Sequence, residues 1–299
     1  MKTGPALALL LIAGPAAAHA PAAGSSSTEL WLILCLLLVA LLYGTGLLRL
    51  WRRAGVGRRV AHWRAGCFAA GWVITLLALA SSLHRWADDL LFIHMSEHEL
   101  LMSAAAPLLV LGRPLGVFAW ALPLRWRHAL AGWQPGRVLS ACWHRLTQPG
   151  TATAVHGAAI WIWHVPTLFD AAVLHEGVHV LQHLSFFVTA LLFWSALFDD
   201  YRRQRALAAV LYLFVTAVHT SLLGALLVVS DRLWYLQRNP AAAVEWELTA
   251  LEDQQLAGLI MWVPGGVVYA VAALWLFGLW LMRRPARQSW ERDDAFPSN

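Results

Sequence analysis

The chain has 299 residues, of which 59% are hydrophobic and 13% are charged, and its mean hydropathy is +0.57. Soluble domains contain about 45–50% apolar and about 25% charged residues, so this composition excludes an ordinary water-soluble domain and indicates a membrane protein. The net charge of +5 does not indicate nucleic-acid binding, because the arginines stand in short runs between apolar segments, as at the ends of membrane spans.

The N-terminal residues predict a secretory signal or leader segment over residues 1–20. This stretch contains one lysine, a short apolar run and several small residues before its end. A short external linker (residues 21–29) is expected next, followed by a membrane domain over residues 30–284 and a cytoplasmic tail over residues 285–299.

The apolar segments predict an all-α fold, a polytopic transmembrane bundle of about seven helices. A membrane span needs about 20 predominantly apolar residues. The segments that meet this requirement are 30–50, 63–84, 90–112, 150–173, 174–198, 206–230 and 254–282. The fourth and fifth segments almost touch, and because Pro166 interrupts helical hydrogen bonding we expect the turn between them near Pro166 to His175.

Arginines in alternate connections predict the orientation of the spans. They cluster after the first, third, fifth and seventh predicted spans, whereas connections 84–89 and 231–253 carry more acidic than basic residues. Positively charged connections stay in the cytoplasm, so we predict that the N-terminus lies outside and the C-terminus inside.

Two of the predicted spans carry histidines on one helical face. His94, His98 and Met102 follow one another at intervals of four residues in the third span, and His175, His179 and His183 have the same spacing in the fifth. Residues four apart on an α-helix differ by about 40° around the axis, so each set forms a stripe. Counted from the outer ends of their spans, His98 and His183 both lie about 12 Å deep.

Other polar residues are expected near these stripes. His164 closes the outer end of the fourth span, His219 lies in the middle of the sixth, and Asp253 and Gln254 open the seventh. Polar side chains inside a membrane face the bundle interior and mark functional pathways, because exposure to lipid is unfavourable. We therefore favour a metal or haem site in the outer half of the bundle over a proton relay or a purely structural network.

The residue types favour copper as the metal. Imidazole binds copper, zinc and haem iron, and a thioether favours Cu(I). The candidate ligands are His94, His98, Met102, His164, His179 and His183. Each ligating ring needs an acceptor for its other nitrogen, and the candidate acceptors are Glu97, Glu99, Asp170, Glu176 and Asp253. Haem held by axial histidines remains an alternative, whereas the absence of a close cysteine pair argues against thiolate metal transfer.

A second alternative is a membrane metalloprotease. His175, Glu176 and His179 match the H-E-x-x-H motif, in which two histidines bind zinc and the glutamate acts as general base. The sequence identifies neither a third ligand nor a substrate cleft, so this interpretation ranks below copper binding.

Three blocks of sequence resemble those of a known family. They are "HMSEHELLMSAAAPLLVLGRP", "WHVPTLFDAAVLHEGVHVLQHLSFFVTALLFW" and "EDQQLAGLIMWVPGG". They are similar, across about residues 60–285, to the polytopic CtaG family, assembly factors for the caa-type cytochrome c oxidase. The resemblance assigns the family pattern to His94, His98, Pro107, Gly112, Pro114, His164, Pro166, Asp170, His179, His183, Trp194, Asp253, Gln254, Gly258 and Trp262. Glu99 and Ser103 depart from it, since members are often rich in Met or Leu there.

The resemblance implies a non-enzymatic, multi-pass protein of the inner (plasma) membrane that helps to assemble a haem-copper cytochrome c oxidase. We expect it to accept copper from a periplasmic donor and to pass it to apo-oxidase subunits through the outer histidines. The expected supporting residues are Asp170, His175, His219, Asp253 and Gln254. A haem-binding electron-transfer protein and a membrane metalloprotease that uses His175, Glu176 and His179 are the remaining alternatives.

Overall fold

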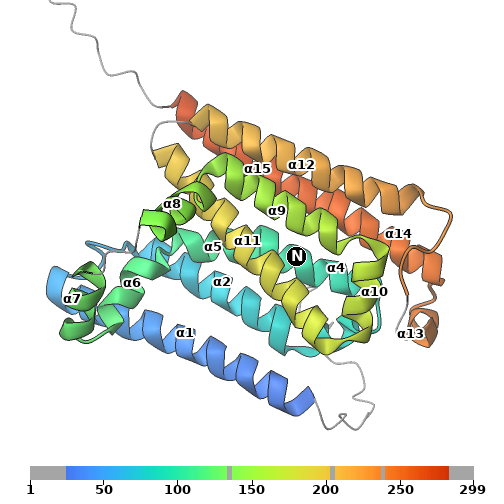
Figure 1. Cartoon of the computed structure of the whole chain (residues 1–299), viewed down its shortest axis with the longest axis horizontal. Helices are drawn as coiled ribbons and strands as arrows, with labels where there is room; N and C mark the ends of the chain where they lie inside the picture. Colours follow the sequence, from blue (N-terminus) through green and yellow to red (C-terminus); the bar gives the residue numbers. More distant parts are fainter. Residues whose placement is uncertain (1–24, 133–136, 203–205, 237–239, 283–299) are drawn as a thin grey trace, which may run out of the picture.

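The computed structural model describes residues 25–132, 137–202, 206–236 and 240–282 (Figure 1). Helices make up nearly all of this part of the chain and no strand occurs in it, so the predicted all-α class is confirmed. The predicted leader and cytoplasmic tail lie outside the described residues. Part of the expected external linker is helical, because the first helix already begins at Ser25.

Within the described ranges, five helical runs are long and apolar enough to cross a membrane, and the number rises to seven if each of two bent pairs forms one span. The five runs are α1 (Ser25–Ala54), α2 (His62–Ala80), α11 (Glu176–Arg202), α12 (Ala206–Val229) and a last run that joins α14 (Ala250–Ile260), η2 (Met261–Gly265) and α15 (Gly266–Leu281). This number agrees with the predicted polytopic bundle.

The first bent pair contains the third predicted span. It consists of α4 (Leu91–Glu99), the π-helical segment η1 (Leu100–Ala105) and α5 (Ala106–Leu111), followed by α6 (Pro114–Ala121) at an angle of 58°. Arg113 connects the two parts with a φ of 52°, a left-handed conformation that is unusual for a residue with a side chain.

The second bent pair contains the fourth predicted span, α9 (Pro149–Trp163), followed by α10 (Pro166–Leu174) at 73°. The turn expected near Pro166 to His175 is therefore itself a short helix, with the chain turning on either side of it. Pro166 is the first helical residue, where its missing N–H and fixed φ suit a helix start. The shorter helices α3 (Ser82–Ala87), α7 (Leu124–Gly132), α8 (Arg137–Leu146) and α13 (Pro240–Glu245) lie in the connections.

The described helices pack around three apolar cores. The main core contains side chains from α4, η1, α5, α9, α10, α11, α12 and the α14–η2–α15 run. A smaller core joins α1 and α2 to α5 and α6, and a third joins the end of α3 to α4 and α13. Figure 1 shows α1 along one edge of the bundle and α12 with α15 along the opposite edge. The first helix, α1, thus contributes no buried side chain to the main core, whereas α5 contributes Ala106 to the main core and Leu109 to the smaller one.

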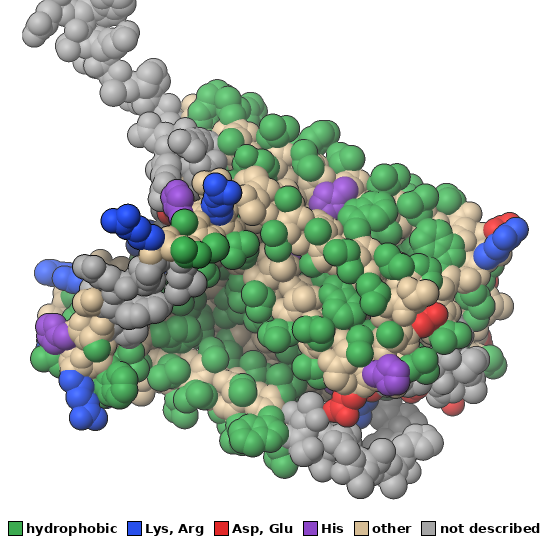
Figure 2. Space-filling view, viewed as in Figure 1, with side chains coloured by type: hydrophobic (Ala, Val, Ile, Leu, Met, Phe, Trp, Pro, Cys, Tyr) green, Lys and Arg blue, Asp and Glu red, His purple; other side chains and the backbone are tan. Residues whose placement is uncertain are grey.

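Charged and apolar side chains occupy different parts of the surface. Figure 2 shows apolar side chains over the middle of the visible face, Lys and Arg gathered near α6, α7 and α8, and Asp and Glu at the opposite end. Large side chains on the outer face of α12, such as Leu211 and Phe214, are more than half exposed. This distribution suits a bundle surrounded by lipid.

Both π-helical segments have local causes. In η1 the carbonyl of Met102 accepts a hydrogen bond from the indole Nε1–H of Trp194 at 2.9 Å, outside the helical ladder. In η2 Pro264 lacks a backbone N–H and cannot continue that ladder. Such segments widen a helix locally and occur often at functional sites.

Glycines allow α12 and α14 to approach closely. A Cβ at Gly224 would lie 2.6 Å from the carbonyl oxygen of Gly258 and 2.8 Å from the backbone nitrogen of Trp262. Small residues at such crossings bring helix backbones together in membranes, where van der Waals packing holds helices in place. Because the obstructing atoms belong to the backbone, a larger residue at this crossing requires a helix to move.

We therefore expect Gly224→Ala to lower the stability of the detergent-purified protein by about 1–3 kcal/mol, since overpacking forces backbone shifts. Thermal unfolding followed by circular dichroism measures this change. The matched control is Gly278→Ala on α15, where nothing lies within 4 Å of the added Cβ. Equal melting temperatures for the two variants would contradict the packing described for this crossing.

Candidate metal centre

Four histidines from two helices converge inside the bundle. His94 and His98 lie on α4 and His179 and His183 on α11, and we call these four residues the histidine cluster. The ring centroids are 4.3 Å apart for His94 and His98, 4.5 Å for His179 and His183, and 4.7 Å for His98 and His183. The two predicted stripes therefore face each other at one depth.

The ring nitrogens are close enough to share one ion. Nε2 of His183 lies 2.9 Å from Nε2 of His179 and 3.3 Å from Nε2 of His98. The ligand atoms of His94, His179 and His183 all lie within 4.8 Å of one another. A metal about 2.0 Å from each nitrogen in a tetrahedral arrangement separates them by about 3.3 Å. Small movements of the rings would therefore complete a site.

Hydrogen bonding among the rings cannot satisfy both short contacts of His183. An imidazole nitrogen carries either one hydrogen or one lone pair, so Nε2 of His183 can form one full hydrogen bond at a time. The contacts at 2.9 Å and 3.3 Å would compete for it. A cation bound by the lone pairs of all three nitrogens removes this conflict.

The cluster is shielded from solvent. His94, His98 and His183 are buried, and His179 is partly buried. Close beside them, His164 ends α9 and interacts electrostatically with His98. Its Nδ1–H donates to the carbonyl of Ile160 at 2.7 Å, which leaves Nε2 as the unprotonated nitrogen of the neutral ring. Nε2 of His164 is buried and has no hydrogen-bond partner among the described residues.

Met102 continues the stripe of His94 and His98 into η1. Its side chain is buried in the main apolar core together with Ala106 and Trp194. Its predicted role as a soft ligand remains a prediction, because the ring nitrogens alone define the cluster described above.

Two of the predicted acids, Asp253 and Asp170, accept hydrogen bonds from the backbone instead of from the imidazoles. The Asp253 carboxylate accepts the N–H groups of Leu91 and Phe92, each at 2.9 Å, and so caps the start of α4. Asp170 accepts the N–H of Leu236 at 2.9 Å. These contacts fix the helix that carries His94 and His98, and the loop that precedes α13.

The same loop is tied to the end of α9. Gln254 accepts the N–H of Trp234 at 2.7 Å and donates to the carbonyl of Arg232 at 3.0 Å. The hydroxyl of Tyr235 donates to the carbonyl of His164 at 3.1 Å. Burial raises the pKa of Tyr235, and the nearby Asp170 carboxylate adds to the rise, so the phenol keeps the proton that it donates.

Two predicted supporting histidines lie apart from the cluster. His219 lies against Gly157 and interacts electrostatically with His156. His175 is exposed where α10 meets α11, as is Glu176. Of the H-E-x-x-H motif, only the second histidine, His179, therefore lies in the histidine cluster. This arrangement does not support the protease interpretation.

Sequence reasoning missed His84 and Gln182. Nδ1–H of His84 donates to Oε1 of Glu97 at 2.9 Å, and this oxygen lies 3.7 Å from Nδ1 of His183. Gln182 is fully buried, and neither atom of its amide has a partner among the described residues. Its position three residues after His179 on the same helical face was the available signal. His84 gave no such signal, because it lies outside the histidine-bearing spans.

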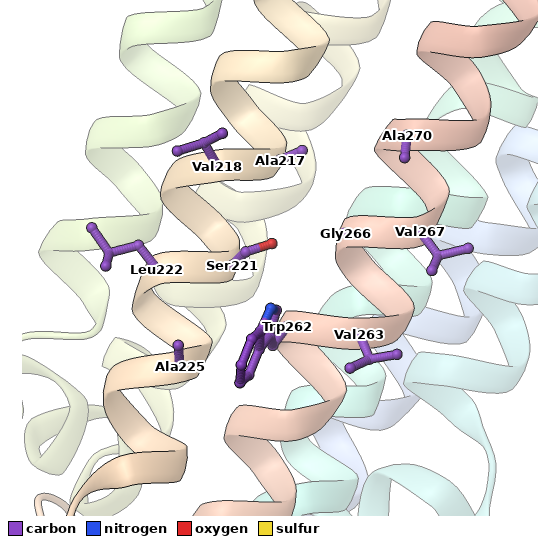
Figure 3. A pocket seen from close by; sticks show the side chains of 10 residues that line it. All are labelled: Ala217, Val218, Ser221, Leu222, Ala225, Trp262, Val263, Gly266, Val267 and Ala270. Carbon is purple, nitrogen blue, oxygen red and sulfur yellow. The ribbon is translucent and has the colours of Figure 1, made fainter.

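A groove on the outer surface of the bundle has fewer polar side chains than the histidine cluster. It lies between α12 and the η2–α15 segment, measures about 650 Å³ and is lined mainly by small and apolar residues such as Ala217, Gly266 and Trp262 (Figure 3). Ser221 supplies a hydroxyl, and no titratable side chain belongs to the lining. The histidine cluster is therefore the stronger candidate for a functional site.

Comparisons with known proteins agree with the resemblance predicted from the three sequence blocks. The family described as cytochrome c oxidase caa3 assembly factor (Caa3_CtaG) matches residues 41–283. An uncharacterized protein of Mycobacterium leprae (strain TN), ML1998, is 26% identical over 252 residues, which cover 80% of this chain and 37% of that protein. The chain thus spans less than half of this curated relative. No solved structure matches the chain significantly.

The capping contacts of Asp253 generate a stability prediction. Replacing Asp253 with Ala leaves two N–H groups at the start of α4 without their acceptor, and we expect a loss of about 1–3 kcal/mol. Chemical unfolding in detergent measures it. The control is Asp231→Ala, because that side chain is 93% exposed. If both variants unfold alike, Asp253 does not stabilise the helix that carries His94 and His98.

Proposed function

The chain belongs to the Caa3_CtaG family of cytochrome c oxidase caa3 assembly factors, and on that premise we propose that it binds copper at the histidine cluster and hands it to an apo-oxidase subunit. The family supports a membrane-bound role in oxidase assembly. The copper cargo, the transfer step and the periplasmic donor belong to the proposal.

One observation carries the copper proposal. The single Nε2 of His183 faces two other ring nitrogens at 2.9 Å and 3.3 Å, and a bound cation satisfies all of them. Imidazole ligands suit copper and zinc, whereas Mg²⁺ and Ca²⁺ prefer oxygen ligands. Copper is the ion of this group that a haem-copper oxidase needs as a component of its own active centre.

Transfer by ligand exchange suits neutral imidazoles. No covalent bond forms, and each ring releases the ion as a ring of the receiving protein replaces it. His98, His183 and His179 form a continuous series of neighbouring nitrogens, so an ion can change partners without full hydration in between. His164, held by the carbonyl of Ile160, would supply a further lone pair near His98.

The predicted topology gives the handover a location. The cluster lies at the end of the bundle near α3 and α10, which the charge pattern predicts to face outside. A periplasmic donor and the receiving subunit would both reach the protein from that side of the inner membrane. Such a handover changes no covalent bond in a substrate, which fits a non-enzymatic assembly factor.

Haem binding is the alternative that the test must separate from copper binding. Axial histidines bind haem from opposite sides of a flat macrocycle, whereas the rings of His98 and His183 lie with centroids 4.7 Å apart and nitrogens in contact. The packed rings therefore favour a single ion. A Soret band in the purified protein would instead support haem.

The first functional prediction concerns copper content. After exposure to Cu(I) and removal of excess ion, we expect about one copper ion per wild-type chain by elemental analysis. His94→Ala/His98→Ala and His179→Ala/His183→Ala should each lose most of it. The control is His128→Ala/His175→Ala, which removes two exposed histidines. Unchanged copper content in both cluster variants would end the copper proposal.

The second functional prediction concerns the oxidase. In the organism that encodes this protein, we expect deletion to lower cytochrome c oxidase activity, and expression of the wild-type chain or of His128→Ala/His175→Ala to restore it. The His179→Ala/His183→Ala variant should not restore activity although it reaches the membrane in equal amount. Full restoration by that variant would separate the assembly role from the histidine cluster.

A further inference from the structure

We propose that His84 is the entrance ligand of the metal site, held in place by Glu97, and that the ion passes from His84 to the histidine cluster. This inference rests on the proposed function, because it assigns the route of the same cargo. Neither residue belongs to the ligand set that the sequence predicted.

His84 lies at the boundary between the surface and the buried cluster. It belongs to α3, in the connection between α2 and α4, at the end of the bundle that carries the cluster. The exposed fraction of its side chain is 28%, whereas that of Glu97 is 0% and that of His183 is 10%. An ion arriving from solvent can therefore meet His84 before it meets the deeper rings.

The hydrogen bond to Glu97 prepares His84 for a metal. Nδ1–H of His84 donates to Oε1 of Glu97 at 2.9 Å, so the neutral ring carries its lone pair on Nε2. Metal-binding histidines commonly donate their other ring nitrogen to a carboxylate, which fixes the tautomer and raises the basicity of the ligand. Glu97 is thus a positioning residue for His84.

Glu97 also connects the entrance to the cluster. The oxygen that accepts from His84 lies 3.7 Å from Nδ1 of His183. The other carboxylate oxygen, Oε2, is buried without a hydrogen-bond partner among the described residues. In its ionised form, this carboxylate would attract a cation more strongly than a carboxylate in water does, because the protein surroundings screen the charge less. The carboxylate therefore favours movement of the ion inward.

The rings form a continuous series from His84 to the cluster. His84 stacks on His179 with centroids 5.9 Å apart and meets His183 edge-on at 6.0 Å. His179 and His183 are themselves 4.5 Å apart. Each step of an ion along this series can therefore begin before the previous ligand is released.

A purely structural role for the pair makes a different prediction. If His84 and Glu97 only joined α3 to α4, replacing His84 would lower stability and leave the rate of metal uptake by the folded protein unchanged. An entrance ligand affects the rate of uptake more than the amount of metal held at equilibrium, because the deeper rings still form the final site.

The experiment measures transfer of Cu(I) to the detergent-purified apo-protein from a coloured Cu(I)–chelator complex, by stopped-flow absorbance. We expect His84→Ala and Glu97→Gln to slow uptake by about tenfold. His84→Ala should retain the wild-type copper content at equilibrium. His175→Ala is the matched control, since it removes an exposed histidine from the same end of the bundle, and should take up copper at the wild-type rate.

Other outcomes overturn the inference. Wild-type uptake rates in His84→Ala would do so, and so would loss of equilibrium copper, which would make His84 a ligand of the final site. If His84→Ala fails to fold, His84→Cys replaces it, and this variant should keep rapid uptake because a thiolate also binds Cu(I). A wild-type protein that binds no copper would instead refute the proposed function, since it fails before any rate is compared.

Discussion

The contact of His183 with two other imidazoles is the constraint on which the site depends. Its Nε2 can satisfy one hydrogen bond, yet it lies 2.9 Å from His179 and 3.3 Å from His98. Buried polar groups that remain unsatisfied destabilise a protein, and more so in a membrane where water cannot replace the missing partner. The arrangement therefore requires either a shared cation or a compromise among the rings, and it explains why α4 and α11 must be held in fixed register.

Much of the rest of the structure supplies that register. Asp253 caps α4, the Gly224–Gly258 crossing lets α14 pack closely on α12, and Trp194 on α11 donates to the carbonyl of Met102 in η1. Asp253, Trp194 and Gly258 all belong to the pattern that the family resemblance assigned. The pattern thus combines residues of the histidine cluster with residues that align its helices.

Composition and periodicity predicted the all-α bundle and the facing stripes, because span length and helical spacing are local properties of a sequence. They could not predict that Pro166 begins a separate helix, since the direction of a chain after a break depends on packing. The role of His84 was also hidden. It stands in a short connection, and its neighbours Glu97, His179 and His183 meet it only after three helices have folded together.

The charge beside the cluster bears on which ion the proposed site favours. Glu97 is buried against His84 and His183, whereas Glu99 turns away to accept the hydroxyl of Ser103 at 2.7 Å. A cuprous ion next to one ionised carboxylate leaves no net charge, but a divalent ion leaves one uncompensated positive charge in a poorly solvated interior. Such a charge is strongly unfavourable there, so an ionised Glu97 would favour Cu(I) over Zn²⁺ at the proposed site, even though imidazole alone accepts both. Selectivity between Cu(I) and Zn²⁺ would then depend on the carboxylate of Glu97 as much as on the ligating imidazoles.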